Sequence, residues 1–403
     1  MRCLVPGLHL LLGLCISCAA PSVAPTIVAQ TIVPAQKPVA TRAITLAPPT
    51  PTPVPADFRI IAYVTDAIVE SVIPYPKLTH INYAFLTPTG DGTFNTIGNA
   101  WKLQRIAKNA HAHGVKVLIS VGGWGWEKQF AAVTATPELR SVFVRNLKSF
   151  VEGFQIDGAD IDWEYPPAGR SAANFLLLIR ELRVAMPDRL LTAAVVSHGD
   201  NAAGISPETF ELFDFVNVMA YDGPEHGTMQ QFMQGLSYWS ARGVPQQKIV
   251  MGVPFYARVK NSSAEGMQYS KLVKADARAA QTDEFEVYGV TQIYNGIPTI
   301  KAKTKIAVQQ AGGIMFWNLV SDALGELSLS AAIYQAANTP LLGCTLCKGC
   351  ALCRAALMQR GRLASRPVCY RNLRAQLVID VAFVRLVSAQ LPAATHNKAS
   401  TGP

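Results

Sequence analysis

The sequence predicts an α/β fold, a (β/α)8 TIM barrel, and two observations support this. Eight short apolar runs alternate with helix-length segments between residues 57 and 340, an alternation typical of parallel strands joined by crossover helices. This stretch also has the size of one such barrel, about 250 residues. Because functional groups of this fold gather at the carboxyl ends of the strands, we expect the site there.

The predicted strands are short apolar runs between turn-forming segments. They are residues 59–64, 79–86, 116–121, 158–164, 190–197, 215–221, 248–256 and 313–318. Helices are expected over residues 137–153 and 171–186, and within residues 301–310 before the last strand. This order places each helix as a crossover between neighbouring parallel strands.

The segment before the barrel indicates export. Residues 1–20 hold a short apolar run behind Arg2, which fits a secretory signal peptide and is too short to span a bilayer. Cys18 is compatible with a lipoprotein signal or with ordinary cleavage nearby. Residues 21–56 are rich in Pro and Thr and form a predicted linker. We expect an extracellular or cell-surface protein that meets a membrane only through such an anchor.

The net charge of +9 comes from the two ends of the chain. Residues 341–403 hold nine basic side chains and one acidic, and residues 1–56 hold three basic and none acidic. The predicted barrel is therefore nearly neutral, and no nucleic-acid partner is expected. Residues 341–403 also hold cysteines at CxxC spacing, and we interpret them as a poorly ordered tail, a zinc knuckle or a disulfide-linked anchor.

One predicted strand carries acidic side chains in strict alternation. Residues 157–164 read Asp-Gly-Ala-Asp-Ile-Asp-Trp-Glu. Since alternate residues of a strand share a face, Asp160, Asp162 and Glu164 point into the barrel, and Asp157 has a structural role at the strand start. Like charges and burial raise carboxyl pKa values, so at least one proton is retained near neutral pH. The pattern favours acid–base chemistry over a structural cluster or a divalent-metal site.

These residues resemble the signature of glycoside hydrolase family 18, the chitinase family, which is Asp-x-x-Asp-x-Asp-x-Glu on the fourth barrel strand. Four other segments are similar to the family's motifs on strands three, six, seven and eight. They are residues 116–124, 219–222, 252–258 and 312–317. The resemblance covers residues 58–338. Only 53 residues separate Arg258 from Gly312, so we expect a reduced insertion after strand 7 and an open cleft.

The resemblance implies a catalytic set that uses no metal and no cofactor. In this family the N-acetyl oxygen of the substrate is the nucleophile. Glu164 would act as general acid and then as base, and Asp162 would bind the acetamido N–H. Asp160 would share a proton with Asp162, and Tyr221 would hold the acetyl oxygen for in-line attack.

The resemblance also implies a set of substrate-binding residues. They are Trp317, Tyr63, Phe85, Met219, Asp222 and Trp124. Trp317 would form an indole floor under the sugar, and Trp124 an outer stacking site. Tyr63 and Phe85 would wall the pocket, with a plain core role as an equal alternative.

The expected function is that of a secreted, endo-acting chitinase that cleaves β-1,4 bonds between N-acetylglucosamine units, as a monomer. Two alternatives remain open. One is an endo-β-N-acetylglucosaminidase for N-glycans or a peptidoglycan-directed glycosidase, which needs the same acetamido chemistry. The other is a chitin-binding lectin, although such proteins usually lose the acid that Glu164 supplies here.

Overall fold

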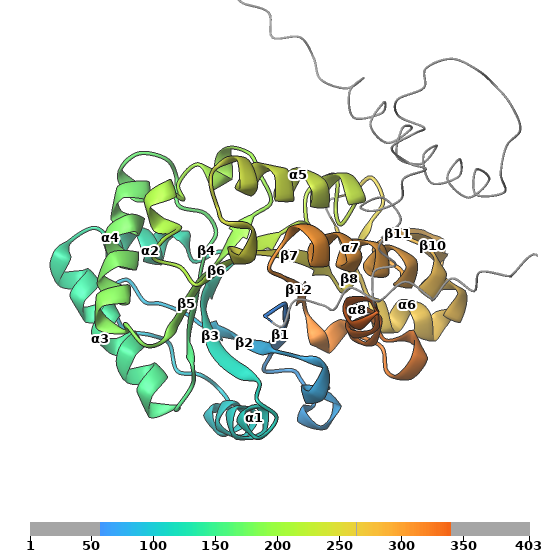
Figure 1. The fold of residues 1–403 in the computed structure, drawn as a ribbon, viewed down its shortest axis with the longest axis horizontal. Coiled ribbons are helices and arrows are strands. Elements are labelled where there is room, and N and C mark those ends of the chain that lie inside the picture. Colours follow the sequence, from blue (N-terminus) through green and yellow to red (C-terminus); the bar gives the residue numbers. More distant parts are fainter. Residues whose placement is uncertain (1–56, 263, 340–403) are drawn as a thin grey trace, which may run out of the picture. The chain divides into compact units, whose positions relative to one another are not determined.

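The computed structural model describes residues 57–262 and 264–339. The predicted signal peptide with Cys18, the linker and the tail over residues 341–403 lie outside these residues. Eight parallel strands close into a barrel in the order β1-β12-β7-β6-β5-β4-β3-β2, with helices on the outside (Figure 1). The predicted (β/α)8 fold is therefore confirmed. Among the helices of the described ranges, none has the length and apolar character that crossing a bilayer needs.

Each predicted strand corresponds to one barrel strand. The strands are β1 (Arg59–Thr65), β2 (His80–Leu86), β3 (Lys116–Gly123), β4 (Gly158–Trp163), β5 (Leu190–Val196), β6 (Phe215–Met219), β7 (Ile249–Pro254) and β12 (Gly313–Trp317). The predicted strands that reach residues 164 and 221 end earlier in the structure, at Trp163 and Met219. Glu164 and Tyr221 therefore follow the barrel strands and lie on the turns at its carboxyl end.

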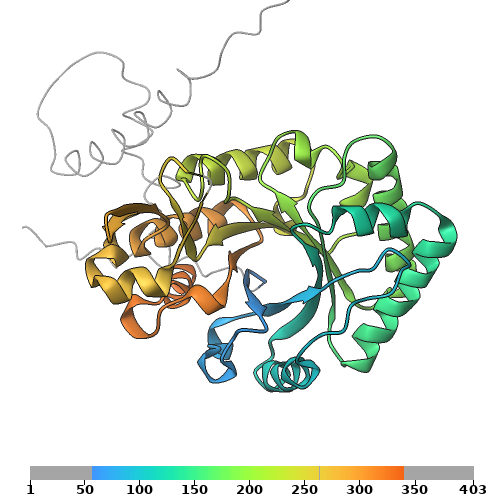
Figure 2. The same ribbon diagram turned by 180° about the vertical axis from the view of Figure 1, so that it is seen from behind.

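The helices surround the barrel, as the view from behind also shows (Figure 2). They are α1 (Ala100–Ala112), α2 (Glu127–Thr134), α3 (Pro137–Gly153), α4 (Arg170–Ala185), α5 (Met229–Ala241), α6 (Tyr269–Ala275), α7 (Ile297–Gln310) and α8 (Leu329–Asn338). Local sequence explains where α3 begins. Thr136 accepts a hydrogen bond from the Leu139 N–H, and Pro137 occupies the first turn, where no N–H is needed.

Short 3-10 turns complete the connections. They are Glu70–Val72, Tyr75–Lys77, Asp200–Ala202, Pro207–Thr209, Gln246–Lys248, Ala277–Gln281, Leu319–Ser321 and Gly325–Leu327. The insertion after β7 holds α6 and a four-stranded antiparallel sheet in the order β10-β11-β8-β9. Its strands are β8 (Tyr256–Val259), β9 (Glu265–Gln268), β10 (Glu284–Val287) and β11 (Val290–Ile293). This small sheet is the reduced insertion that the sequence predicts.

The alternation of β4 separates two apolar cores. Ala159, Ile161 and Trp163 belong to the outer core between strands and helices, where the Trp163 ring stacks on Phe130 at a centroid distance of 5.2 Å. A second cluster fills the barrel interior and includes Tyr63, Met219, Tyr221 and Met315. The acidic side chains of β4 lie on this interior side, as the parity argument predicts.

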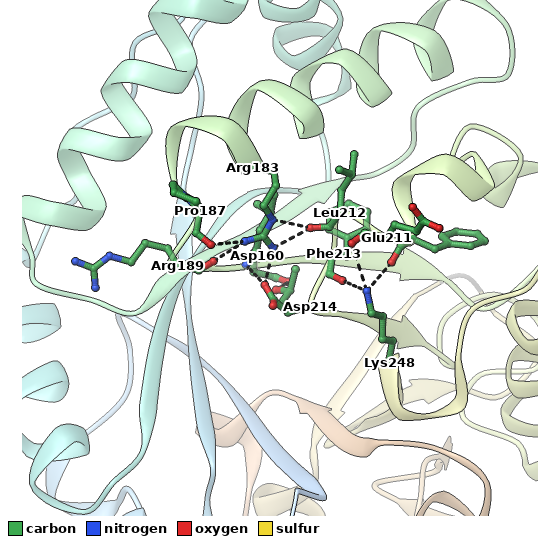
Figure 3. A network of polar contacts seen from close by, with 12 residues as sticks. Asp160, Arg183, Pro187, Arg189, Glu211, Leu212, Phe213, Asp214 and Lys248 are labelled. Carbon is green, nitrogen blue, oxygen red and sulfur yellow. Dashed lines mark hydrogen bonds and ion pairs between the residues drawn. The ribbon is translucent and has the colours of Figure 1, made fainter.

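The amino ends of β5, β6 and β7 are joined by a polar network (Figure 3). The Arg183 guanidinium of α4 donates to the Leu212 carbonyl at 2.8 and 2.9 Å and to the Asp214 carboxylate at 2.7 Å. Asp214 also accepts from the Leu191 N–H at 2.8 Å. Lys248 Nζ donates to the carbonyl oxygens of Phe210 and Phe213. These bonds satisfy carbonyl groups at the closed end of the barrel, opposite the carboxyl ends of the strands.

We predict that Arg183→Met lowers the free energy of unfolding by about 1–3 kcal/mol, because it leaves the part-buried Leu212 carbonyl without its side-chain donor and removes one of the hydrogen bonds to Asp214. Urea denaturation of the two proteins measures the difference. Arg180→Met is the matched control, since Arg180 lies on the exposed side of the same helix and its loss changes stability by about 0.5 kcal/mol or less. Equal stability of the two variants would contradict the role of Arg183.

Candidate active site

Asp160 lies at the centre of a hydrogen-bond network inside the barrel. Its carboxyl group is fully buried and accepts from four side chains on four different strands. The donors are Tyr63 Oη at 2.7 Å, Ser120 Oγ at 2.9 Å, Thr192 Oγ1 at 2.6 Å and Asn217 Nδ2 at 3.0 Å. Burial raises the pKa of Asp160, and the four donors offset only part of that rise.

Asp162 lies one step nearer the mouth of the barrel and is only 3% exposed. Its Oδ1 atom is buried and has no hydrogen-bond partner among the described residues. Burial, and then the charges of Glu164 and Asp160, raise the pKa of Asp162 well above its ordinary value. An unpartnered buried oxygen costs about 1–3 kcal/mol, so this atom is poised to accept a hydrogen bond from a bound ligand.

Glu164 follows the last residue of β4 and is half-buried. Burial raises its pKa to about 7; the charge of Asp222 adds to the rise and the Tyr165 phenol opposes it. Near neutral pH the group can therefore give or take a proton, which general acid–base catalysis requires. This agrees with the expectation that the acidic cluster keeps at least one proton.

Tyr221 and Asp222 follow β6 and lie across the site. The Tyr221 hydroxyl is 3.9 Å from the Met315 sulfur, a weak acceptor. Burial raises the pKa of Tyr221 well above its ordinary value, so the phenol stays a donor. Asp222 Oδ1 accepts from Tyr256 Oη at 2.6 Å and from Arg258 Nε at 3.0 Å. Both partners belong to β8 of the insertion.

An aromatic cluster forms one side of the mouth. The rings of Trp317 and Phe85 stack at a centroid distance of 5.4 Å and an interplanar angle of 24°, and both are half-buried. Tyr63 meets the Trp317 edge at 5.7 Å. Because Tyr63 is 2% exposed and gives its hydroxyl to Asp160, the structure places it in the core, while Phe85 and Trp317 line the opening. Met219 is also buried in the interior cluster.

Two further residues lie apart from this centre. Trp124, in the turn after β3, is 78% exposed at the carboxyl end of the barrel. Asp157 lies at the other end of β4 and accepts from the Val117 N–H at 2.8 Å, Lys116 Nζ at 2.9 Å and His111 Nε2 at 2.7 Å. Burial raises the pKa of Asp157, but these three bonds outweigh it and lower the pKa overall. The structural role predicted for Asp157 fits this position.

Several residues of the site escape the sequence prediction. They are Ser120, Thr192, Asn217, Tyr165, Tyr256 and Arg258. The inward parity of Ser120, Thr192 and Asn217 on their strands could have identified them as partners of the acidic strand. In residues 57–262 and 264–339, no three His, Cys, Asp or Glu side chains are grouped as ligands for a metal ion.

A closed parallel barrel whose mouth holds a carboxyl with a pKa raised to about 7 has the features of a (β/α)8 site for acid–base chemistry. A family model described as Glycosyl hydrolases family 18 matches residues 59–322. Because this match covers more than half of the chain, the protein belongs to that family.

Individual proteins show the same relationship. Chitinase 1 of Aphanocladium album is 26% identical over 341 residues, which cover 65% of this chain and 80% of that protein. A chitinase-like effector of Moniliophthora roreri is 31% identical over 226 residues, 48% of this chain and 55% of the effector, so the chain spans little more than half of that relative. The crystal structure of a chitinase from Bacteroides thetaiotaomicron has a TM-score of 0.63 and 28% identity, and the match covers 69% of this chain and 96% of that one.

We predict that Asp222→Asn lowers the pKa of Glu164 from about 7, because a nearby negative charge favours the protonated form, while burial, the larger cause, still holds this pKa above the ordinary glutamate value. Carboxyl ¹³C NMR of selectively labelled protein measures this pKa. Asp200→Asn, at an exposed position, is the control and leaves the titration unchanged. An unaltered Glu164 titration in Asp222→Asn would contradict the coupling.

Proposed function

We propose that this protein hydrolyses β-1,4-linked N-acetylglucosamine polymers, chitin and chitooligosaccharides, by substrate-assisted retaining catalysis. One observation carries the proposal: Glu164, with a pKa of about 7, directly follows β4 and acts on the charge of Asp162, whose buried Oδ1 has no hydrogen-bond partner among the described residues. A proton donor and a hydrogen-bond acceptor are what an acetamido sugar needs at the bond to be cleaved. The relative named Chitinase 1 supports the same substrate class.

In the first step, Glu164 gives its proton to the glycosidic oxygen while the acetyl oxygen of the substrate attacks the anomeric carbon. The bond to the leaving sugar breaks and an oxazolinium ion forms. Asp162 Oδ1 accepts the acetamido N–H and stabilises the positive charge on that group. In the second step the Glu164 carboxylate takes a proton from water, and the water oxygen bonds to the anomeric carbon. The bond between that carbon and the acetyl oxygen breaks, which opens the oxazolinium ring.

Two neighbours support these steps. Asp160, held by four donors, shares a proton with Asp162, so the ionisation of this pair belongs to both groups. The Tyr221 hydroxyl, whose contact in the free protein is the weak acceptor Met315, donates to the acetyl oxygen and holds it in line with the anomeric carbon.

Sugar binding is assigned to the aromatic residues at the mouth. Trp317 stacks on the apolar face of the sugar at the cleaved bond, beside Phe85. Trp124, largely exposed at the same end of the barrel, provides an outer stacking position. Asp222 offers a carboxylate oxygen to sugar hydroxyl groups, and Met219 packs below the pocket.

Two other functions stay as candidates. The same catalytic residues suit an endo-β-N-acetylglucosaminidase for N-glycans or a glycosidase for peptidoglycan. A lectin that binds chitin without cleaving it is the second, and the relative named a chitinase-like effector keeps it open. The presence of Glu164, the proposed general acid, with a pKa raised to about 7, favours the enzyme.

The cellular setting is proposed from sequence alone. The apolar run in residues 1–20 supports export, and Cys18 supports a lipid anchor at the cell surface or ordinary secretion. We propose that the barrel acts there as a monomer. The Pro/Thr-rich residues 21–56 then serve as the spacer between surface and barrel.

We predict that Glu164→Gln lowers kcat for a fluorogenic chitotrioside by about 10²–10⁴-fold, because glutamine cannot donate the proton. Affinity for chitooligosaccharides, measured by calorimetry, stays close to that of the wild type. Glu127→Gln, an exposed position at the same end of the barrel, is the control. A chitobiose-core N-glycan assayed in parallel decides between the two enzyme functions, and wild-type binding without hydrolysis of either substrate would favour the lectin.

A second prediction concerns the substrate. Oligosaccharides with glucosamine in place of N-acetylglucosamine at the cleaved unit should lose nearly all turnover, because the acetyl oxygen is the proposed nucleophile. Mass spectrometry of the products locates the cleaved bond. Equal rates on acetylated and deacetylated units would refute the substrate-assisted mechanism.

A further inference from the structure

The segment that carries Tyr221 and Asp222 lies outside the barrel strands. β6 ends at Met219, and Asp222 has a φ of 65°, in the left-handed region that is uncommon for residues other than glycine. Neither side chain can hold its direction unless this backbone is fixed. The contacts that fix it come from two buried residues that do not reach the mouth, His226 and Gln231.

His226 connects the two elements whose side chains meet in the site. Its ring is buried, Nδ1 accepts from the Asp222 N–H at 3.1 Å, and Nε2 lies 3.1 Å from the Tyr256 carbonyl oxygen. A backbone N–H can only donate and a carbonyl can only accept, so the imidazole is neutral with its proton on Nε2. His226 therefore joins the backbones of Asp222 and Tyr256, whose side chains bond each other at 2.6 Å.

Gln231, at the start of α5, holds the same segment from its other side. Its Nε2 donates to the carbonyl oxygens of Tyr221 at 3.1 Å and Asp222 at 2.8 Å. Its Oε1 accepts from the Gly227 N–H at 3.0 Å. The buried Lys303 of α7 donates to the Gly227 carbonyl at 2.6 Å. The turn is thus tied to α5, α7 and the insertion together.

We propose that His226 and Gln231 are positioning residues that set the direction of the Tyr221 phenol and the Asp222 carboxylate toward Glu164. This inference rests on the proposed function for its kinetic consequence. Neutral His226 is required, and burial lowers its pKa to about 4. The groups that face it are Asp222 on its own turn, Tyr256 and Arg258 on β8, and Lys303 on α7. Glu164 is faced by Asp162, Tyr165 and Asp222.

The first test needs no turnover. His226→Leu removes both hydrogen bonds, while His226→Gln keeps an acceptor and a donor on one planar group. In crystal structures of the two variants, we expect Asp222 to leave Tyr256 and Arg258 in the leucine variant and to stay in the glutamine variant. Tyr221 and Asp222 in their original places in His226→Leu would overturn the inference, whatever the enzyme's substrate. Gln231→Met supplies the same comparison should His226→Leu not fold.

The second test is kinetic. With chitotrioside, His226→Leu should lower kcat by about 10- to 100-fold, since small misplacement of positioned groups costs this much, and should change KM less. The basic limb of the pH profile of kcat should shift from its wild-type position, because a displaced Asp222 carboxylate acts on Glu164 from a different distance. His226→Gln should restore both.

His80→Leu is the matched control for the kinetic test. His80 is half-buried and also has a pKa lowered to about 4 by desolvation, but its ring packs on Phe215 at 5.4 Å and not on the segment after β6. It should lose thermal stability without a shift of the basic limb. The same loss of kcat and the same shift in both leucine variants would overturn the positioning role. A wild type without turnover would defeat the proposed function alone, because the crystallographic comparison stands independently.

Discussion

The charges of Asp160 on β4 and of Glu164 just after it both disfavour ionisation of Asp162 between them, and the site depends on this repulsion. Burial raises the pKa of Asp160, and donors from four other strands offset part of that rise. Asp162 has no such support at Oδ1 and is driven to keep a proton. Glu164, half-buried at the mouth, lies between these extremes. The three carboxyl groups therefore differ in environment. Asp160 is fully hydrogen-bonded, Asp162 has an oxygen without a partner, and Glu164 is the most exposed. These differences in burial and in hydrogen-bond donors determine the pKa shift of each group.

The barrel divides its tasks between its two ends. At the amino ends of the strands, Arg183, Asp214 and Lys248 satisfy carbonyl groups and join neighbouring loops, which holds the fold closed. At the carboxyl ends, β4 stops at Trp163 and β6 stops at Met219. The residues that follow, Glu164 and Tyr221, lie on turns, where their direction is not set by the strand. The carboxyl ends hold the less usual features, an unpartnered oxygen of Asp162 and a left-handed Asp222.

The strands and the inward direction of Asp160, Asp162 and Glu164 could be predicted from the sequence, because both follow from periodicity. The small insertion could be predicted from the number of residues between Arg258 and Gly312 together with the family resemblance. The partners of Asp222 could not be predicted. Tyr256 and Arg258 lie more than thirty residues away, and they meet Asp222 only because the insertion folds back over the barrel. The sequence left two equal roles for Tyr63, in the pocket wall or in the core. The alternation along a strand predicts that its side chain points inward, but it does not identify Asp160 as the group that accepts its hydrogen bond.

The carboxylate of Asp222 is held by Tyr256 and Arg258, so a hairpin outside the barrel governs a charge that acts on Glu164. Evolution can therefore retune the acidity at which such a protein works by altering a peripheral β-hairpin, while the carboxyl-bearing strand stays untouched.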